Sequence, residues 1–180
     1  MVGAALKRYV WLALAALALS YLVALGLTGG RPGPGLAPFE ARGLLREVPL
    51  ESIGAVELST DGHAWRFERT EAGIWRVARG SPVSALERDL PTALTLLRNS
   101  GPERTLSASE IGPSGLRDFG LDRPRVTVAV HTSSAEPLVI AFGGANALAS
   151  IRYARVAGRD DVLFLPAFVA QAWERLAGIP

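Results

Sequence analysis

The sequence predicts an α+β fold: an N-terminal transmembrane helix, then a mainly antiparallel β-sheet domain with two or three packed helices. Three observations support this prediction. The stretch 9–27 contains no charged residue, apolar and polar residues alternate from residue 53 onward, and leucines recur at helical spacing over 85–98. The order of strands followed by a helix occurs twice, which is compatible with two β-meander-plus-helix half-units.

Composition and charge limit the classes of function. Once the apolar N-terminal stretch is set aside, the remaining residues suffice for one domain with a hydrophobic core. Because Lys7 and Arg8 precede that stretch, 17 of the 19 basic residues remain in the body, against 17 acidic ones. A neutral body without a basic stripe gives no reason to expect a nucleic-acid partner. The absence of cysteine excludes a disulfide, a thiolate nucleophile, a cysteine-ligated zinc ion and an anchor through a lipidated cysteine.

The strongest signal is the apolar stretch itself. YVWLALAALALSYLVALGL, residues 9–27, is long enough to cross the hydrocarbon core of a bilayer as a helix. Because Lys7 and Arg8 precede it directly, the positive-inside bias places the N-terminus in the cytoplasm and the rest of the chain outside. A cleaved secretory signal is the alternative, since small residues near the end of the stretch match a cleavage site. The residues expected to form the membrane anchor are Tyr9, Trp11, Leu14, Leu17, Tyr21 and Leu25.

A linker is predicted after this helix. TGGRPGPGLAPFEARG, residues 28–43, is rich in glycine and proline and favours a semi-extended spacer. Leu44 and Leu45 either begin the fold or form a short docking turn. The predicted organisation is a cytoplasmic N-terminus (1–8), a transmembrane helix (9–27), a Gly/Pro-rich linker (28–50) and an extracytoplasmic α+β domain (51–180).

The first half of the domain is predicted to be a three-stranded meander followed by a helix. Alternation over 53–77, with turn signals in STDGHA and EAGIW, predicts the strands. Ser84 and Glu87 have the spacing of a capping box. Pro91 predicts a kink, or a second helix that starts there. The helix face expected to lie on the sheet consists of Leu86, Leu90, Leu94 and Leu97.

The stretch RDFGLDRPRVTVAV, residues 117–130, can be interpreted as a structural turn, called the corner below, or as a functional site. Ser114 is expected to cap a short helical turn, and Gly120 to close it in the left-handed conformation with Leu121 folded back onto it. Pro124 is expected to start a strand whose valines share one face. The predicted structural turn therefore consists of Gly120, Leu121, Asp122 and Pro124. A binding or catalytic role of Asp122 and Arg123 is the alternative.

Three further strands and a closing helix are predicted for the second half. The strands are 138–142, 151–156 and 162–165, and Pro166 suits the first position of the helix. One side of that helix is expected to consist of Phe168, Val169, Ala172, Trp173 and Leu176.

The segments FGLDRPRVTVAV, VIAFGG, IRYARVAG and DVLFLPAFVAQAW, with GAVELSTDGHAWRFERTEAGIWRV before them, resemble a family of bacterial membrane-anchored envelope proteins, the domain-of-unknown-function family 4340. The resemblance covers residues 53–176 and is most specific at Gly120-Leu121-Asp122 with Pro124. It implies an N-terminal membrane anchor and an α+β body outside the cytoplasm. For some members it also implies a link to transporter or gliding-motility auxiliary components. It implies no enzyme activity and carries over no functional residue.

No catalytic, cofactor-binding or metal-binding residue is predicted. His63 and His131 are the only histidines, each alone on a predicted strand, and no HExxH motif or paired carboxylate accompanies them. IGPSG lacks the spacing of a nucleophile elbow. FGGANA lacks the lysine of a phosphate-binding loop and the spacing of a dinucleotide-binding loop. Asp160 and Asp161 are interpreted as solvated turn residues.

Large aromatic side chains offer the candidate partner contacts. Trp65, Trp75 and Trp173 are expected either in the core or, where exposed on the sheet, as anchors for a partner. The predicted partners are the lipid bilayer, through residues 9–27, and membrane proteins.

The sequence thus favours a single-pass binding protein of the bacterial inner membrane with its C-terminal domain in the periplasm. Its expected role is that of an accessory, assembly or stabilising subunit of a membrane protein complex. A free-standing periplasmic domain that binds a small ligand or a peptide, as in a transporter auxiliary component, is the alternative.

Overall fold

The chain divides into two compact units, Met1–Phe39 and Glu40–Pro180. The computed structural model describes residues 14, 16–23, 42–80, 84–112, 115–133 and 136–179. In the first unit residues 14 and 16–23 are helical, and the predicted anchor residues Leu14, Leu17 and Tyr21 are exposed there. Within the described ranges, no helix has both the length and the apolar character needed to span a bilayer. Outside these ranges lie Tyr9, Trp11, Leu25 and residues 28–41 of the predicted linker.

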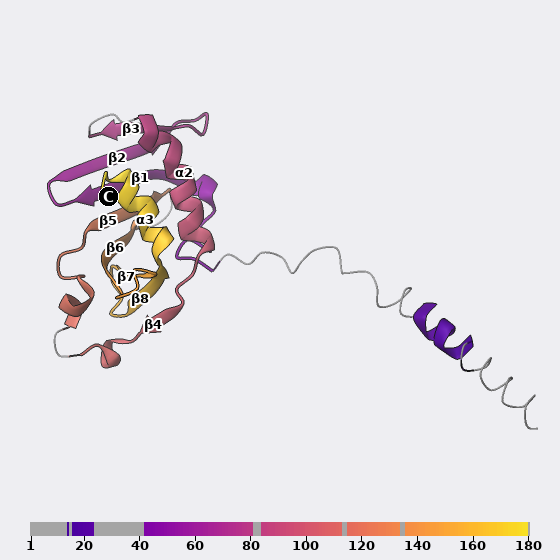
Figure 1. Cartoon of the computed structure of the whole chain (residues 1–180). Coiled ribbons are helices and arrows are strands. Elements are labelled where there is room, and N and C mark those ends of the chain that lie inside the picture. Colours follow the sequence, from indigo (N-terminus) through magenta and orange to yellow (C-terminus); the bar gives the residue numbers. More distant parts are fainter. Residues whose placement is uncertain are drawn as a thin grey trace, which may run out of the picture. The chain divides into compact units, whose positions relative to one another are not determined.

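The second unit has an α+β fold with an antiparallel sheet, as the sequence predicts, and all eight strands belong to that one sheet (Figure 1). The strand order is β3-β2-β1-β5-β6-β7-β8-β4, and all neighbours are antiparallel. The strands are β1 (Ile53–Thr60), β2 (His63–Arg69), β3 (Trp75–Arg79), β4 (Arg104–Leu106), β5 (Val126–Thr132), β6 (Leu138–Ala145), β7 (Ile151–Val156) and β8 (Val162–Pro166). The helices are α2 (Ser84–Asn99) and α3 (Ala167–Leu176), with short 3-10 turns η1 (Leu50–Ser52), η2 (Ala108–Glu110) and η3 (Gly115–Phe119).

The order of the elements along the chain accounts for this sheet. β1, β2 and β3 form the predicted meander that ends in α2, and β5 to β8 form a second meander that ends in α3. β1 and β5, the first strands of the two meanders, pair with each other, so the meanders extend away from this central pair in opposite directions. β4 was not predicted, because its sequence RTL is too short to show an alternation.

Helices α2 and α3 lie side by side on one face of the sheet (Figure 1). Leu90, Leu94 and Leu97 of α2 are buried against this face, as their spacing predicts. α2 continues through Pro91 as one helix, so the predicted second helix starting at that proline is wrong. The main core between helices and sheet includes Val56, Leu58, Phe67, Val126, Val128, Val130, Ile140, Phe142, Leu163, Leu165, Val169 and Trp173.

The side chain of Ser84, one partner of the predicted capping box, lies outside the described residues. The helix begins at Ser84 itself. The Glu87 carboxylate accepts a hydrogen bond of 2.9 Å from the backbone N–H of Val77 in β3. Glu87 therefore ties α2 to the edge of the sheet.

Two further expectations need correction. Residues 43–50, predicted as the end of the linker, belong to the folded unit: Leu45 is fully buried in the core, and the Gly43 N–H donates to the Arg98 carbonyl at 2.8 Å. Phe168, predicted on the buried side of α3, is 48% exposed. The buried residues of α3 around Val169 include the small residues Ala170 and Ala172. The apolar side of the helix therefore faces away from Phe168.

The face of the sheet opposite the helices is divided into two parts. Over β6, β7 and β8 it carries a second apolar cluster to which the segment between β4 and β5 contributes. The members of this cluster are Leu106, Ile111, Leu116, Phe119, Leu121, Ala141, Tyr153, Val162 and Phe164. Over β2, β1 and β5 the same face forms a surface depression.

Candidate functional site

The corner between η3 and β5 has the predicted conformation. Gly120 has a φ of +65°. Its N–H donates to the Arg117 carbonyl, and the N–H of Leu121 donates to the Leu116 carbonyl, both at 2.9 Å. This pair of hydrogen bonds defines a Schellman end, and buried Leu121 packs in the second cluster with Leu116, as such an end requires. Ser114, expected to cap the turn, lies outside the described residues.

The two glycines of FGGANA pack against this corner. A Cβ atom at Gly120 would lie 2.9 Å from the backbone nitrogen of Gly144, and one at Gly143 would overlap with the carbonyl oxygen of Phe119. The pairing of β6 with β7 changes register at this point. The glycine pair thus serves a close backbone approach, and it forms one structural unit with the corner. Asp122 is exposed and Pro124 is half-buried in this unit.

The acidic residues of the β7–β8 turn are paired with arginines. Arg155 donates to Asp160 at 3.1 Å, and Arg159 donates two hydrogen bonds to the Asp161 carboxylate. The hydrogen bond from Arg159 holds the pKa of the Asp161 carboxyl below its usual value, and the charge of Arg155 acts in the same direction. Asp160 is solvated, as predicted, whereas the side chain of Asp161 is only 16% exposed, so the prediction of a solvated residue is wrong for Asp161.

The two histidines lie on different strands. His63 of β2 stacks on Trp65 with ring centroids 5.8 Å apart. In β5, the Nε2 atom of His131 lies 3.6 Å from Oε1 of Glu57, which also accepts a hydrogen bond of 2.5 Å from Arg66. Among the residues that the structure describes, no group of three or more potential metal ligands from His, Asp or Glu side chains comes together.

The three candidate tryptophans lie in or against the main core. Trp173 is 0% exposed and Trp75 is 6% exposed, so the prediction of a surface contact is wrong for both. Trp65 shares the helix-covered face of the sheet with its strand partner Leu58 and packs, half-buried, against the same core. The reason is geometric. Trp65 and Trp75 fall on the core-facing side of their strands at the two-residue period, and Trp173 follows buried Val169 by one helical turn in α3.

A buried ion cluster beneath α3 was missed in the sequence. Glu174 is 3% exposed, and its Oε2 atom accepts a hydrogen bond of 2.8 Å from Arg152 of β7. Arg125, just before β5, lies 3.6 Å from the other oxygen, Oε1. A buried charge is costly unless it is paired, so the cluster fixes α3 over these strands. One feature of the sequence indicates this burial. Glu174 follows Ala170 by one helical turn and therefore falls on the apolar side of α3.

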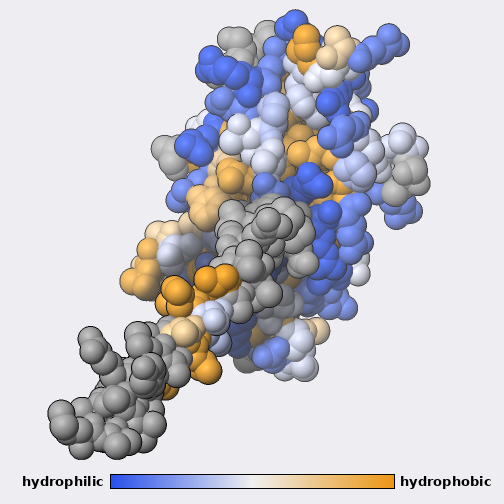
Figure 2. Space-filling view, turned by 90° about the vertical axis from the view of Figure 1, so that its right-hand side faces the viewer, coloured by the Kyte–Doolittle hydropathy of each residue, from blue (hydrophilic) through white to orange (hydrophobic). Residues whose placement is uncertain are grey.

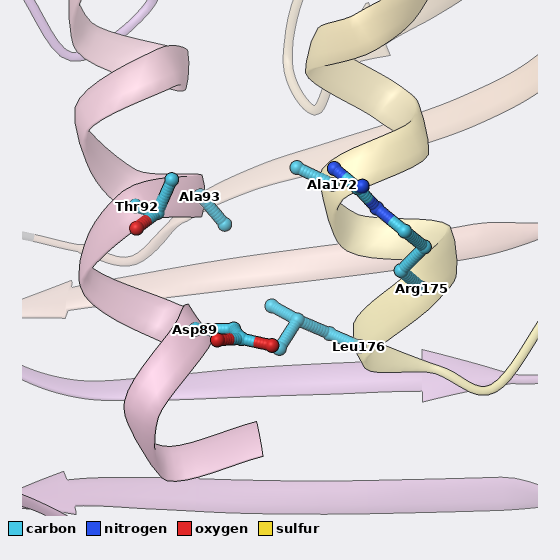
Figure 3. Close-up of a pocket in the computed structure, with 6 residues that line it drawn as sticks. All are labelled: Asp89, Thr92, Ala93, Ala172, Arg175 and Leu176. Carbon is cyan, nitrogen blue, oxygen red and sulfur yellow. The ribbon is translucent and has the colours of Figure 1, made fainter. Parts of the chain in front are cut away.

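A groove of about 280 Å³ runs between the two helices (Figure 3). Its floor consists of Ala93, Ala172 and Leu176, which are nearly fully buried. The methyl groups of Ala93 and Ala172 point into the space between the helices, with Asp89 on α2 and Arg175 on α3 beside it. The groove therefore offers a narrow apolar floor and one charge of each sign.

A second surface lies on the opposite face of the sheet. There a depression of about 310 Å³ has a floor of small side chains and a charged rim, and its lining includes Glu57, Ser59, Ala64, Arg66, Arg79, Thr127, Ala129 and Val139. It adjoins a depression of about 610 Å³ that shares Ser59 and Thr127 with it and is also lined by Asp61, Arg123 and Arg125. We call this pair of depressions the open face. Because the side chains of its floor are small, the backbone of another segment can approach the sheet closely there.

On the side of the molecule seen in Figure 2, exposed hydrophobic residues lie in several places between hydrophilic ones.

Comparison with protein-family models, with curated proteins and with solved structures finds no match to this chain. The resemblance to the domain-of-unknown-function family 4340 therefore stays a prediction.

Proposed function

We propose that this chain is a single-pass membrane protein whose folded unit works by binding, as an accessory, assembly or stabilising subunit of a membrane protein complex. Residues 9–27 form the transmembrane anchor in the bacterial inner membrane, and the folded unit, Glu40–Pro180, lies in the periplasm. One observation carries the proposal: a charge-free apolar stretch directly after Lys7 and Arg8 is joined to a separate compact unit.

The energetics of insertion support the anchor. A single arginine, lysine or aspartate at the centre of a membrane helix costs about 2.5–3.5 kcal/mol, whereas leucine and valine favour insertion. Residues 9–27 contain none of these charged residues and are mostly leucine, alanine and valine. Lys7 and Arg8 precede the stretch, and the positive-inside bias therefore favours an orientation with the N-terminus in the cytoplasm.

Two exposed surfaces support a binding role. The groove between α2 and α3 and the open face both combine small or apolar floors with charged side chains at the rim. An apolar centre with a polar rim is the usual composition of protein interfaces. The balance of basic and acidic residues in the body favours contact with proteins over contact with nucleic acid.

Strand addition by a free peptide, the basis of the alternative function, is less favoured. Such binding needs an open sheet edge. At one edge the Val77 N–H of β3 already donates to Glu87, and at the other edge β4 comprises three residues, Arg104–Leu106. Short or covered edge strands are devices that protect a sheet against added strands.

The proposal is tested by purifying the tagged full-length chain from detergent-solubilised native membranes. We expect recovery in the membrane fraction together with a stoichiometric membrane-protein partner. Leu17→Arg places a charge near the middle of 9–27 and should remove the chain from the membrane fraction, whereas Leu36→Arg in the linker should not. Recovery of the wild type as a lone soluble species after osmotic shock would contradict the proposal and favour the free-standing alternative.

A further inference from the structure

The groove between α2 and α3 carries charges of opposite sign on its two walls (Figure 3). Asp89 lies on α2 with a side chain that is 61% exposed, and Arg175 lies exposed on α3. Arg88 is 3.6 Å from Asp89, but both side chains are exposed, and such a surface pair contributes little. In the part of the chain that the structure describes, no acidic side chain forms an ion pair with Arg175. Each wall can therefore take a charged partner from outside.

The two helices run in opposite directions along the groove. Figure 3 shows Ala93 and Ala172 at one level of the groove, and Asp89 and Leu176 at the other level. Because Arg175 directly precedes Leu176, its backbone lies at the same end of the groove as Asp89. Its side chain extends toward Ala172, and an exposed arginine can change rotamer and reach either level.

A second copy of this chain fits the groove by symmetry. A two-fold axis that runs along the groove, parallel to both helices, places α2 of each copy on α3 of the other. Rotation about this axis moves no residue along it, so Asp89 of one copy comes to the end of α3 at which Arg175 of the other copy lies. The opposite charges then meet twice, as in an isologous interface.

The four helices of such a pair alternate in direction. Each helix then has two antiparallel neighbours, one from its own copy and one from the other, as in an up-down four-helix bundle. Because Ala93 and Ala172 are small, the two helix layers can approach closely. Phe168 shares one side of α3 with Ala172, four residues later, and the rotation brings it to the level of half-buried Leu96 on α2.

We propose that two copies of this chain associate through the groove between α2 and α3, with Asp89 of each copy paired to Arg175 of the other. The charges of the groove favour a second copy over a partner of one charge sign. An acidic partner would meet Asp89, and a basic one would meet Arg175, whereas a copy related by the two-fold axis meets an opposite charge at both positions. The proposal does not depend on the membrane anchor or on the proposed function.

The open face is less suited to self-association, because its central charges are paired within one copy. Arg66 donates to Glu57 at 2.5 Å and to Glu68 at 2.9 Å. Both hydrogen bonds raise the pKa of the Arg66 guanidinium above its usual value, which reflects how well its charge is already compensated. The groove, in contrast, leaves its two opposite charges on separate walls.

Sedimentation equilibrium of the full-length chain in a non-ionic detergent tests the proposal. We expect a monomer–dimer equilibrium for the wild type, weakened by added salt because the paired charges lie near the surface. Asp89→Arg and Arg175→Asp should each raise the dissociation constant at least about tenfold, since each change turns two attractions into two repulsions.

An equimolar mixture of these two variants distinguishes a contact between copies from one within a copy. In a mixed pair the two introduced charges face each other, and so do the natural Asp89 and Arg175 of the two chains. Dimers should therefore return in the mixture. A contact within one copy cannot give this result, because each variant chain carries the same sign at both positions.

Asp61→Arg and Arg123→Asp serve as matched controls, because both side chains are exposed and line the open face. They should leave the dissociation constant unchanged. All four substituted positions are exposed, so the variants are expected to fold, and the fluorescence of buried Trp75 and Trp173 checks this.

Three results would overturn the proposal. These are a wild-type chain that stays monomeric, dissociation constants of Asp89→Arg and Arg175→Asp no higher than those of the controls, and a mixture that does not associate. Each would leave the proposed function standing, because recovery with a membrane-protein partner tests that function separately. A dimeric chain recovered only in the soluble fraction would contradict the proposed function and support the dimer.

Discussion

Replacing Gly120 by alanine should destabilise the folded unit by about 1–4.5 kcal/mol. The left-handed conformation, with φ at +65°, costs an alanine roughly 1–2 kcal/mol. The added Cβ would lie 2.9 Å from the backbone nitrogen of Gly144, so one of the two backbones must shift. Overpacking of this kind typically costs about 1–3 kcal/mol. The lower entropy of an unfolded chain with alanine offsets roughly 0.4–1 kcal/mol of the sum.

Two matched variants separate these contributions. Gly158 has a φ of +78° and open space around its Cβ position, so Gly158→Ala carries the conformational cost alone and should lose about 1 kcal/mol. Gly54 has neither a positive φ nor a close neighbour, so Gly54→Ala should change stability by about 0.5 kcal/mol or less.

The assay is urea unfolding of the full-length protein in a non-ionic detergent, followed by tryptophan fluorescence. Buried Trp75 and Trp173 report directly on the core. The reasoning is refuted if Gly120→Ala is no less stable than Gly158→Ala, because the close approach to Gly144 would then contribute nothing.

Three further predictions follow from the described contacts. Glu174→Ala leaves the mostly buried side chain of Arg152 without its partner and should cost about 3–5 kcal/mol in the same urea assay; a cost below about 1 kcal/mol would contradict a structural ion cluster. Asp122→Asn should change stability by about 0.5 kcal/mol or less and leave partner recovery intact; a stable variant that loses its partner would show that the corner binds. The folded-state pKa of Asp161 is depressed, so its stabilising contribution is present above the unfolded pKa near 4 and is lost as the pH falls through the folded value. Arg159→Gln should raise this pKa in a carboxyl NMR titration, and an unchanged titration would remove Arg159 as the cause.

Features encoded by local chemistry could be predicted from the sequence. The meander of β1, β2 and β3 follows from a two-residue alternation with glycine turns, and α2 follows from leucines at helical spacing. The corner at Gly120 was predicted in its conformation and its apolar contact, because a Schellman end depends on residues adjacent in sequence.

Features that depend on contacts between distant segments could not be predicted. Gly143 and Gly144 are explained only by the backbone of residues 119–120 against them, which no local pattern contains. Glu174 is a surface residue by composition and becomes buried because Arg152, on another element, reaches it. Trp75 and Trp173 could not be assigned to core or surface until the covering helices were in place.

The central claim, an anchored chain with its folded unit outside the cytoplasm, is tested most directly by cysteine labelling in intact spheroplasts. The natural chain has no cysteine, so single cysteines report unambiguously. With Glu71→Cys, at an exposed turn, we expect the membrane-bound protein to react with a membrane-impermeant maleimide before lysis, whereas Gly3→Cys should react only after lysis. Labelling of Glu71→Cys only after lysis, or its recovery in the soluble fraction, would contradict the account.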